Sequence, residues 1–207
     1  MPKIVNHDSQ REMIAEAVWR IIKRDGVEAA SVRSIAKEAG LSMGALRHYF
    51  PSQSELFIYL MQLVNSKAEK RIRSMIASTS TPTLQQLIHL CMQLLPINDE
   101  TKLEMEVWFW FNAKAVGNPK LQSLSDKIYE DTFLLIKLVI DALIHLNLAK
   151  PGLDASYEID RLYALVDGLG LHCYMYPNHT SPERAASLIT RHIKELCKDE
   201  FDDKGQE

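Results

Sequence analysis

Cysteine is scarce in this sequence. The three cysteines, Cys91, Cys173 and Cys197, are an odd number and form no CxxC pair, which argues against a disulfide framework and against a zinc site. His172 precedes Cys173 directly, so on one helix the two side chains would point about 100° apart and could not easily pair. The chain also lacks a glycine-rich phosphate loop, an HxxxH pair and a nucleophile motif. We therefore expect no metal, no cofactor and no enzyme activity.

Long apolar runs are missing as well. No stretch reaches the roughly 18 to 20 uninterrupted apolar residues of a membrane span, and the N-terminal MPKIVNHDSQRE contains no apolar signal region. The hydrophobic share of 46% and the charged share of 25% are those of an ordinary soluble globular protein. We expect a cytoplasmic protein that does not contact membranes.

Charge is distributed unevenly along the chain. Residues 1–73 contain 12 Lys and Arg against 8 Asp and Glu, whereas residues 74–207 contain 12 against 19. A basic N-terminal part on an acidic body indicates that one end meets a polyanion. A small positive excess is common in proteins, however, so the charge alone does not show that this end binds a polyanion.

The apolar residues repeat with helical spacing, and no period-2 strand is bounded by turn residues. The first helix is expected over about residues 8–25, and Ser31 and Ser42 each cap a short helix after it, over residues 32–39 and 43–49. The pattern predicts an all-α protein of about nine helices, three short ones followed by six mostly longer ones.

Capping residues mark the later helix starts. In chain order they are the S-x-x-E capping box Ser52 to Glu55 and the pairs Thr81-Pro82, Asn118-Pro119 and Ser181-Pro182. For the last helix, Thr180 with Glu183 is a rival capping box. That helix is expected to reach about Asp199.

Two of the short helices are joined by the sequence AGLS at residues 39–42, in which Gly40 supplies the backbone conformation of a tight turn. Two short helices with such a turn, preceded by an amphipathic helix, form a helix-turn-helix signature. The second of them would enter the major groove of DNA with its N-terminal end. The same arrangement occurs in many all-α proteins, so spacing alone leaves DNA binding open.

The segment SMGALRHYF, residues 42–50, has a composition that suits DNA reading. Its two small residues let the helix axis approach DNA, its polar side chains can reach phosphates or base edges, and Leu46 and Phe50 face inward. Helix N-termini attract phosphate, so Ser31 and Arg33 are expected beside the DNA backbone. The predicted DNA-binding residues are Ser31, Arg33, Ser42, Met43, Gly44, Ala45, Arg47, His48 and Tyr49.

The stretch AEAVWRIIKRDGVEAASVRSIAKEAGLSMGALRHYFPSQSELF resembles the N-terminal DNA-binding domain of the tetracycline-repressor (TetR) family of bacterial transcriptional regulators. The resemblance covers about residues 10–57 and is carried by Ala17, Gly26, Val32, Ile35, Ala36, Ala39, Gly40, Leu41, Ser42, Gly44, Leu46, Phe50, Glu55 and Leu56. It implies a helix-turn-helix domain over residues 1–51 and an effector-binding and dimerisation domain over residues 52–207. It also implies a repressor that leaves a pseudo-palindromic double-stranded DNA operator when a small-molecule effector, of unknown identity, binds.

Two positions depart from the family pattern. Arg47 stands where members usually have Tyr, although a subset resembling the betaine-pathway repressor carries a similar G-A-[LI]-R-H-Y-F. Gln53 stands where a Lys usually meets a phosphate, and it can donate a hydrogen bond but brings no charge. We add Gln53 to the predicted DNA-binding residues. Operator preference is the property that transfers least from the family.

The resemblance further implies a homodimer built from the last two expected helices, each of which carries a wide apolar stripe. The same stripes could pack inside a single chain, because both helices must also cover the body. The predicted dimerisation residues are Leu165, Leu169, Cys173, Leu188, Ile189, His192 and Leu196.

An effector pocket in the C-terminal part is implied too, and the run WFWF at residues 108–111 is suggestive in itself. Four consecutive aromatic residues cannot all face the same way on a helix. Methionine and aromatic walls suit an apolar ligand, and ring faces would also suit a cation; ordinary core packing explains the same residues equally. Asp167 is either a polar ligand anchor or a structural hydrogen-bonding group. The predicted effector residues are Met61, Met92, Met105, Trp108, Phe109, Phe111, Tyr129, Phe133, Asp167 and His172.

One alternative function belongs to another class. A helical ligand-binding or adaptor protein whose helix-turn-helix no longer binds DNA would show the same helical pattern. The basic N-terminal part and the cluster Arg47, His48 and Tyr49 argue against it.

Overall fold

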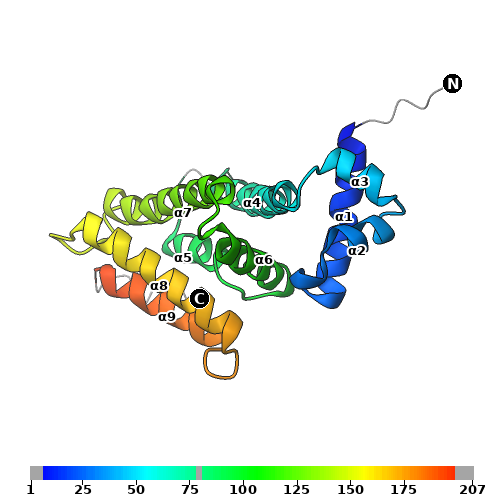
Figure 1. Ribbon diagram of the computed structural model, residues 1–207. Helices are drawn as coiled ribbons and strands as arrows, with labels where there is room; N and C mark the ends of the chain where they lie inside the picture. The colour runs from blue at the N-terminus through cyan, green and yellow to red at the C-terminus, as the bar shows by residue number, and fades with distance from the viewer. Residues whose placement is uncertain (1–6, 78–80, 199–207) are drawn as a thin grey trace. The chain divides into compact units, whose positions relative to one another are not determined.

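The computed structural model describes residues 7–77 and 81–198 of the chain (Figure 1). In this part the chain forms nine α-helices and one short 3-10 helix, η1 (Val27–Ala29). The α-helices are α1 (His7–Asp25), α2 (Val32–Glu38), α3 (Met43–Tyr49), α4 (Gln53–Ala77), α5 (Leu84–Met92), α6 (Asp99–Ala115), α7 (Pro119–His145), α8 (Ala155–Met175) and α9 (Pro182–Leu196). The prediction of an all-α fold with about nine helices is confirmed.

The helices form two compact units. The first contains the described residues within 1–64 together with 106–124, and the second contains those within 65–105 and 125–207. Helices α4, α6 and α7 therefore contribute residues to both units. This division follows packing, and the functional division between residues 51 and 52 stays a prediction.

The start of α5 differs from the sequence prediction. Its N-cap is Thr83 rather than Thr81, because Thr83 and Gln86 form a reciprocal capping box. The backbone N–H of Thr83 donates to the Gln86 Oε1 over 2.8 Å, and that of Gln86 donates to the Thr83 Oγ1 over 3.3 Å. Two satisfied backbone donors outweigh the single cap that Thr81-Pro82 would offer, so that prediction was wrong.

Of the two starts weighed for α9, the structure has Ser181, whose Oγ accepts from the Arg184 N–H over 3.2 Å with Pro182 in the first turn. The helix ends at Leu196, where Cys197 forms an isolated antiparallel bridge with Ala149. Asp199, where we expected the helix to end, lies outside the described residues.

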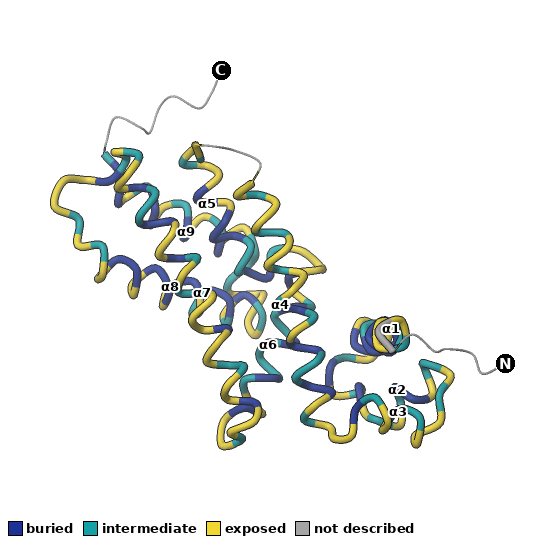
Figure 2. Tube along the Cα trace, turned by 90° about the horizontal axis from the view of Figure 1, so that it is seen from above, coloured by how far each residue is buried: buried dark blue, intermediate teal, exposed yellow. Residues whose placement is uncertain are grey.

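The second unit is built around an aliphatic core from α5, α7, α8 and α9. In this unit α8 and α9 lie side by side and α5 packs on α9 (Figure 1). Fully buried members include Leu87, Ile140, Leu162 and Ile189, each 0% exposed. Buried positions recur along one side of each helix, as the burial colouring of Figure 2 shows. Each such side chain stabilises the fold by about 1.5–3 kcal/mol relative to an exposed one.

A polar clamp also joins α4 to α6 within the second unit. Arg71 donates two hydrogen bonds to Glu104, to Oε1 over 3.0 Å and to Oε2 over 2.8 Å, and its Nε donates to the Gln93 Oε1 over 2.8 Å. The Glu104 side chain is only 11% exposed. Hydrogen bonding to Glu104 raises the pKa of Arg71, which keeps the guanidinium charged. The two-pronged geometry fixes the register of α4 against α6 in this unit.

Replacing Glu104 with Ala is expected to lower the free energy of unfolding by about 2 kcal/mol or more, because Arg71 would lose a charged partner away from water. The matched control is Glu69→Ala, which removes an exposed partner of Arg73 one turn away and should cost no more than about 0.5 kcal/mol. Urea unfolding of the two variants measures the difference. Equal losses would show that the clamp adds nothing beyond a surface ion pair.

His192 is a buried titratable group between α8 and α9. Its side chain is 6% exposed, its Nε2 has no hydrogen-bond partner among the described atoms, and that nitrogen lies 3.8 Å from the Glu158 Oε2. Loss of hydration and the positive charge of Arg161 lower the pKa of His192, while Glu158 and Glu195 act in the opposite direction. The imidazole is therefore neutral at pH 7.

The stability of the protein should consequently fall as the pH drops below about 6.5, because the unfolded chain binds a proton on His192 near its ordinary pKa and the folded chain does so only at lower pH. In the variant His192→Leu this part of the pH dependence should disappear. Denaturant unfolding between pH 7.5 and 5 measures it, with His179→Leu, in an exposed turn, as the control. An unchanged slope in His192→Leu would refute the assignment.

Candidate nucleic-acid interface and effector site

Helix α3 is held on the first unit by two buried side chains. Leu46 is 1% exposed and Phe50, at the C-terminal end of the helix, is 3% exposed. Helix α1 packs on α2 and α2 packs on α3, with Ile35 and Ala36 of α2 buried between them. The inward direction predicted for Leu46 and Phe50 is thus the one observed.

The turn between α2 and α3 is closed by backbone hydrogen bonds. The N–H of Leu41 donates to the carbonyl of Ala36 over 2.8 Å, and the N–H of Gly40 donates to the carbonyl of Lys37 over 3.3 Å. This pair of bonds is a Schellman motif, which requires a left-handed residue after the helix. Gly40 provides it with φ of +66°. Ser42 then caps α3 by accepting from the Ala45 N–H over 3.0 Å.

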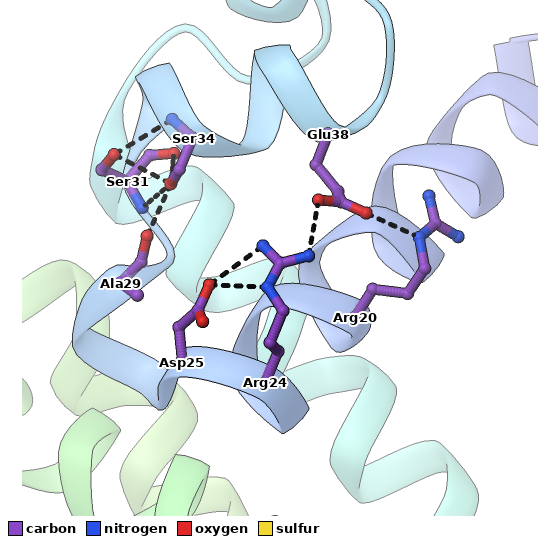
Figure 3. Close-up of polar contacts among 7 residues, drawn as sticks. All are labelled: Arg20, Arg24, Asp25, Ala29, Ser31, Ser34 and Glu38. Carbon is purple, nitrogen blue, oxygen red and sulfur yellow. Dashed lines mark hydrogen bonds and ion pairs between the residues drawn. The ribbon is translucent and has the colours of Figure 1, made fainter.

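The start of α2 is fixed by a pair of serines, drawn in Figure 3. The N–H of Ser34 donates to the Ser31 Oγ over 3.1 Å, and the N–H of Ser31 donates to the Ser34 Oγ over 2.9 Å. The Ser34 hydroxyl also donates to the carbonyl of Ala29. Ser31 is therefore a helix cap, and its predicted contact with DNA stays a prediction.

An ion-pair network fixes the end of α2 against α1, and the sequence analysis did not find it. Glu38 accepts from Arg20 over 3.0 Å and from Arg24 over 3.2 Å (Figure 3). These hydrogen bonds, with Arg20 first, lower the pKa of Glu38. The spacing of Arg20 and Arg24 by one helical turn was the available signal. The arginines are exposed, so the network orients the helices more than it stabilises them.

The predicted DNA-binding side chains of α3 are accessible. Met43, Gly44, Arg47 and His48 are exposed, and their spacing of three and four residues puts them on one side of the helix. Ala45 and Tyr49 are half-buried. Outside α3, the exposed members of the predicted set are Ser31, Arg33, Ser42 and Gln53.

Arg11 of α1 was not identified from the sequence. Its guanidinium lies 5.6 Å from the ring centroids of both Phe50 and Tyr59, and these two rings are 5.0 Å apart. A cation over aromatic faces is attracted to them. The contact joins α1 and α4 to the C-terminal end of α3. No local pattern in the sequence predicts it.

The ten predicted effector residues are divided between the two units. Met61 and Phe111 belong to the first unit and are 2% and 1% exposed, so they pack as core residues there. Trp108 and Phe109 of the same unit are half-buried and meet edge to face at 5.0 Å. That all ten residues line one space stays a prediction.

The remaining predicted effector residues lie in the second unit. Met92 is buried, Phe133 and Met105 are half-buried, and Tyr129, Asp167 and His172 are exposed. The ring of His172 lies 6.2 Å from that of Tyr176, and neither is among the residues that cluster around Tyr129.

Tyr163, which is not among the residues predicted from the sequence, lies close to two residues that are, Tyr129 and Asp167. The ring of Tyr163 is 7% exposed and lies 4.9 Å from the ring of Tyr129. Burial and the charge of Asp167 raise the pKa of Tyr163. Desolvation raises the pKa of Asp167 to about 6, although one side of this residue is exposed to water. The cluster of Tyr129, Tyr163 and Asp167 therefore combines an aromatic pair, of which Tyr129 is exposed, with one carboxylate.

Five of the predicted dimerisation residues are buried within the chain itself. Leu169, Cys173, Ile189, His192 and Leu196 are each no more than 6% exposed. The intramolecular packing that we weighed against dimerisation accounts for their burial.

Only the half-buried members of the set, Leu165 and Leu188, keep surface available to a second chain. On α8, Tyr157 and Met175 are 62% and 55% exposed, and a Cβ built at Gly168 would meet no atom within 4 Å.

Within 7–77 and 81–198, no group of three His, Cys, Asp or Glu side chains is placed to hold a metal ion. None of the described helices combines the length and the apolar composition needed to cross a membrane.

Two family models match this chain, one over each part. Residues 14–60 match the model of bacterial regulatory proteins of the tetR family, and residues 83–198 match the C-terminal model of BetI-type transcriptional repressors. Together they take in the helix-turn-helix and most of the second unit.

Whole-chain comparisons agree with the family models. The chain is 40% identical to the HTH-type transcriptional regulator PksA of Bacillus subtilis (strain 168), over 95% of this chain and 94% of that protein. It is 25% identical to the HTH-type transcriptional regulator BetI of Pectobacterium carotovorum, over 94% and 97%. A transcriptional regulator of Saccharomonospora viridis, solved in complex with choline, shares the fold with a TM-score of 0.81 at 24% identity, over 92% and 98%. The chain belongs to the tetR family of bacterial transcriptional regulators, and its C-terminal part is of the BetI type.

Proposed function

We propose that the protein is a homodimeric repressor that binds a pseudo-palindromic operator through α3 and leaves it when a small-molecule effector binds. It acts in the cytoplasm, by binding rather than by catalysis. One observation carries the proposal: the exposed face of α3, with Met43, Gly44, Arg47 and His48, stands on the buried anchors Leu46 and Phe50. A short polar face on fixed apolar anchors is what a major-groove reader needs.

The dimer is proposed to form through the outer sides of α8 and α9. The inner sides of these helices are occupied by the chain's own core, while Leu165, Leu188 and Gly168 remain partly accessible. A two-fold axis through these helices would present two copies of α3 to two half-sites, because operator symmetry mirrors protein symmetry.

The effector is proposed to carry a positive charge. The exposed ring of Tyr129 packs on that of Tyr163, whose pKa is raised in part by the nearby Asp167, and the pKa of Asp167 is itself raised to about 6 by desolvation. A cation placed there would gain both the ring attraction and the Coulomb attraction. The choline bound by the solved neighbour is a ligand of this chemical class.

A test of DNA binding distinguishes the repressor proposal from the adaptor alternative. A gel-shift titration with the DNA upstream of the protein's own gene, and with duplexes selected from a random library, should retain specific fragments. If no duplex is retained even at low salt, the repressor proposal fails and the adaptor reading takes its place.

Arg47→Ala should weaken operator binding by about 1–3 kcal/mol and relax the base preference at one position of each half-site, because the side chain reads a base edge. The control Arg73→Ala makes the same change of charge at an exposed position of α4, in the second unit and outside the proposed dimer surface, and should leave the affinity within a factor of about two. Fluorescence anisotropy at several salt concentrations measures both. Unchanged affinity and salt slope in Arg47→Ala would show that α3 is placed wrongly.

Binding of choline, used as the probe cation, should strengthen as the pH rises through about 6, because the Asp167 carboxyl must lose its proton to attract the cation. Asp167→Asn should bind more weakly and without this pH dependence, while Asp131→Asn, at an exposed position of α7, serves as control. Calorimetric titration between pH 5 and 7.5 measures the profile. Equal profiles for the wild type and Asp167→Asn would remove Asp167 from the site.

A further inference from the structure

Helix α6 reaches the helix-turn-helix through one carboxylate. The backbone N–H of Val27 donates to the Glu106 Oε1 over 2.8 Å, although the two residues are 79 positions apart in the chain. Both residues belong to the first unit. Val27 is only 7% exposed and the hydrogen bond is partly buried, so loss of the Glu106 carboxylate would remove the acceptor of a partly buried donor, which is costly.

The bond lies at the corner between α1 and α2, here residues 26–31. Gly26 ends α1 with φ of +84°, and the N–H of Ala30 then donates to the carbonyl of Val27 over 3.1 Å. Ser31 follows as the cap of α2. Glu106 thus fixes the beginning of the segment between α1 and α2, and this segment ends at the cap of α2. Helix α2 is followed directly by the turn into α3.

Glu106 is itself fixed by its place on α6. Its neighbour Val107 is 2% exposed and Phe111, one turn further, is 1% exposed, so this part of the helix is anchored in the first unit. Two residues earlier, Glu104 is clamped by Arg71 of the second unit. Residues two apart on a helix point about 200° apart, so the two carboxylates serve different partners without competing.

We propose that Glu106 is a positioning residue for DNA binding. Its hydrogen bond with the N–H of Val27 fixes the corner at residues 26–31 and thereby orients α2 and α3 toward the operator. This rests on the proposed repressor function. Because α6 also carries Glu104 and Met105, whose partners lie in the second unit, a shift of α6 would change the Val27 contact directly.

The first experiment compares Glu106→Ala with Glu106→Gln. Both remove one negative charge, which by itself would strengthen DNA binding, but only Gln keeps an oxygen acceptor for the Val27 N–H. With an operator selected by the wild type from a random duplex library, Glu106→Ala should bind about tenfold more weakly and Glu106→Gln within about threefold of the wild type. Glu100→Ala, which removes an exposed carboxylate and the same charge on the first turn of α6, should not weaken the affinity.

The second experiment removes the donor instead of the acceptor. Val27→Pro lacks the N–H, and proline suits this place because Val27 begins η1 and the ψ of 165° at Gly26 keeps that residue out of the helical region that a following proline disfavours. If one bond carries the effect, the double variant Val27→Pro with Glu106→Ala should lose no more affinity than either single variant. Additive losses would overturn the proposal.

Hydrogen exchange tests the contact without DNA, so the two proposals can fail separately. The amides of residues 26–31 should exchange faster in Glu106→Ala than in the wild type, and at the wild-type rate in Glu100→Ala. If the wild type selects no operator, the repressor proposal fails while the exchange result still judges the bond. Unchanged exchange together with unchanged operator affinity in Glu106→Ala would refute the role of Glu106.

Discussion

A helix of seven residues cannot fold or hold a direction alone, because helix formation needs more turns than it can offer. Helix α3 has this length, so its position depends on what lies beneath it. The burial of Leu46 and Phe50 is the interaction on which the proposed DNA-binding face of α3 depends. Every exposed side chain of that face takes its direction from these two contacts.

Polar contacts then fix the angles between α1, α2 and α3, which apolar packing alone does not determine. The Schellman motif at Gly40 and the cap at Ser42 fix α3 relative to α2, and Glu38 with Arg20 and Arg24 fixes α2 relative to α1. These bonds are exposed and individually weak. Their value lies in geometry, since hydrogen bonds are directional and apolar contacts are not.

Local signals in the sequence predicted the helix-turn-helix well. The caps Ser31 and Ser42 and the left-handed Gly40 act on neighbouring residues, so their spacing alone reveals their role. The start of α5 was misread because Thr81 and Thr83 are equivalent caps until the partner Gln86 is considered. A capping pattern therefore predicts the start of a helix reliably only when both the cap and its partner three residues later are considered.

Contacts between distant residues were beyond such patterns. The bonds from Val27 to Glu106 and from Arg71 to Glu104 join residues 79 and 33 positions apart, and Tyr163 completes the candidate cation site only through packing with Tyr129. An apolar stripe is equally ambiguous, because core and interface select the same residues. His192 and Ile189 illustrate this, since their helix face was assigned to a dimer and is filled by the chain's own core.

Helix α6 has contacts on more than one of its faces. Its consecutive residues Glu104, Met105 and Glu106 have partners on α4, on α8 and at the corner before α2. An effector changes DNA affinity only by binding one arrangement of these contacts better than another. Because each of the three side chains is held by a close contact, α6 has little freedom to shift without breaking one of them. In the proposal made above, the hydrogen bond from Val27 to Glu106 is the contact whose loss would lower the affinity for DNA.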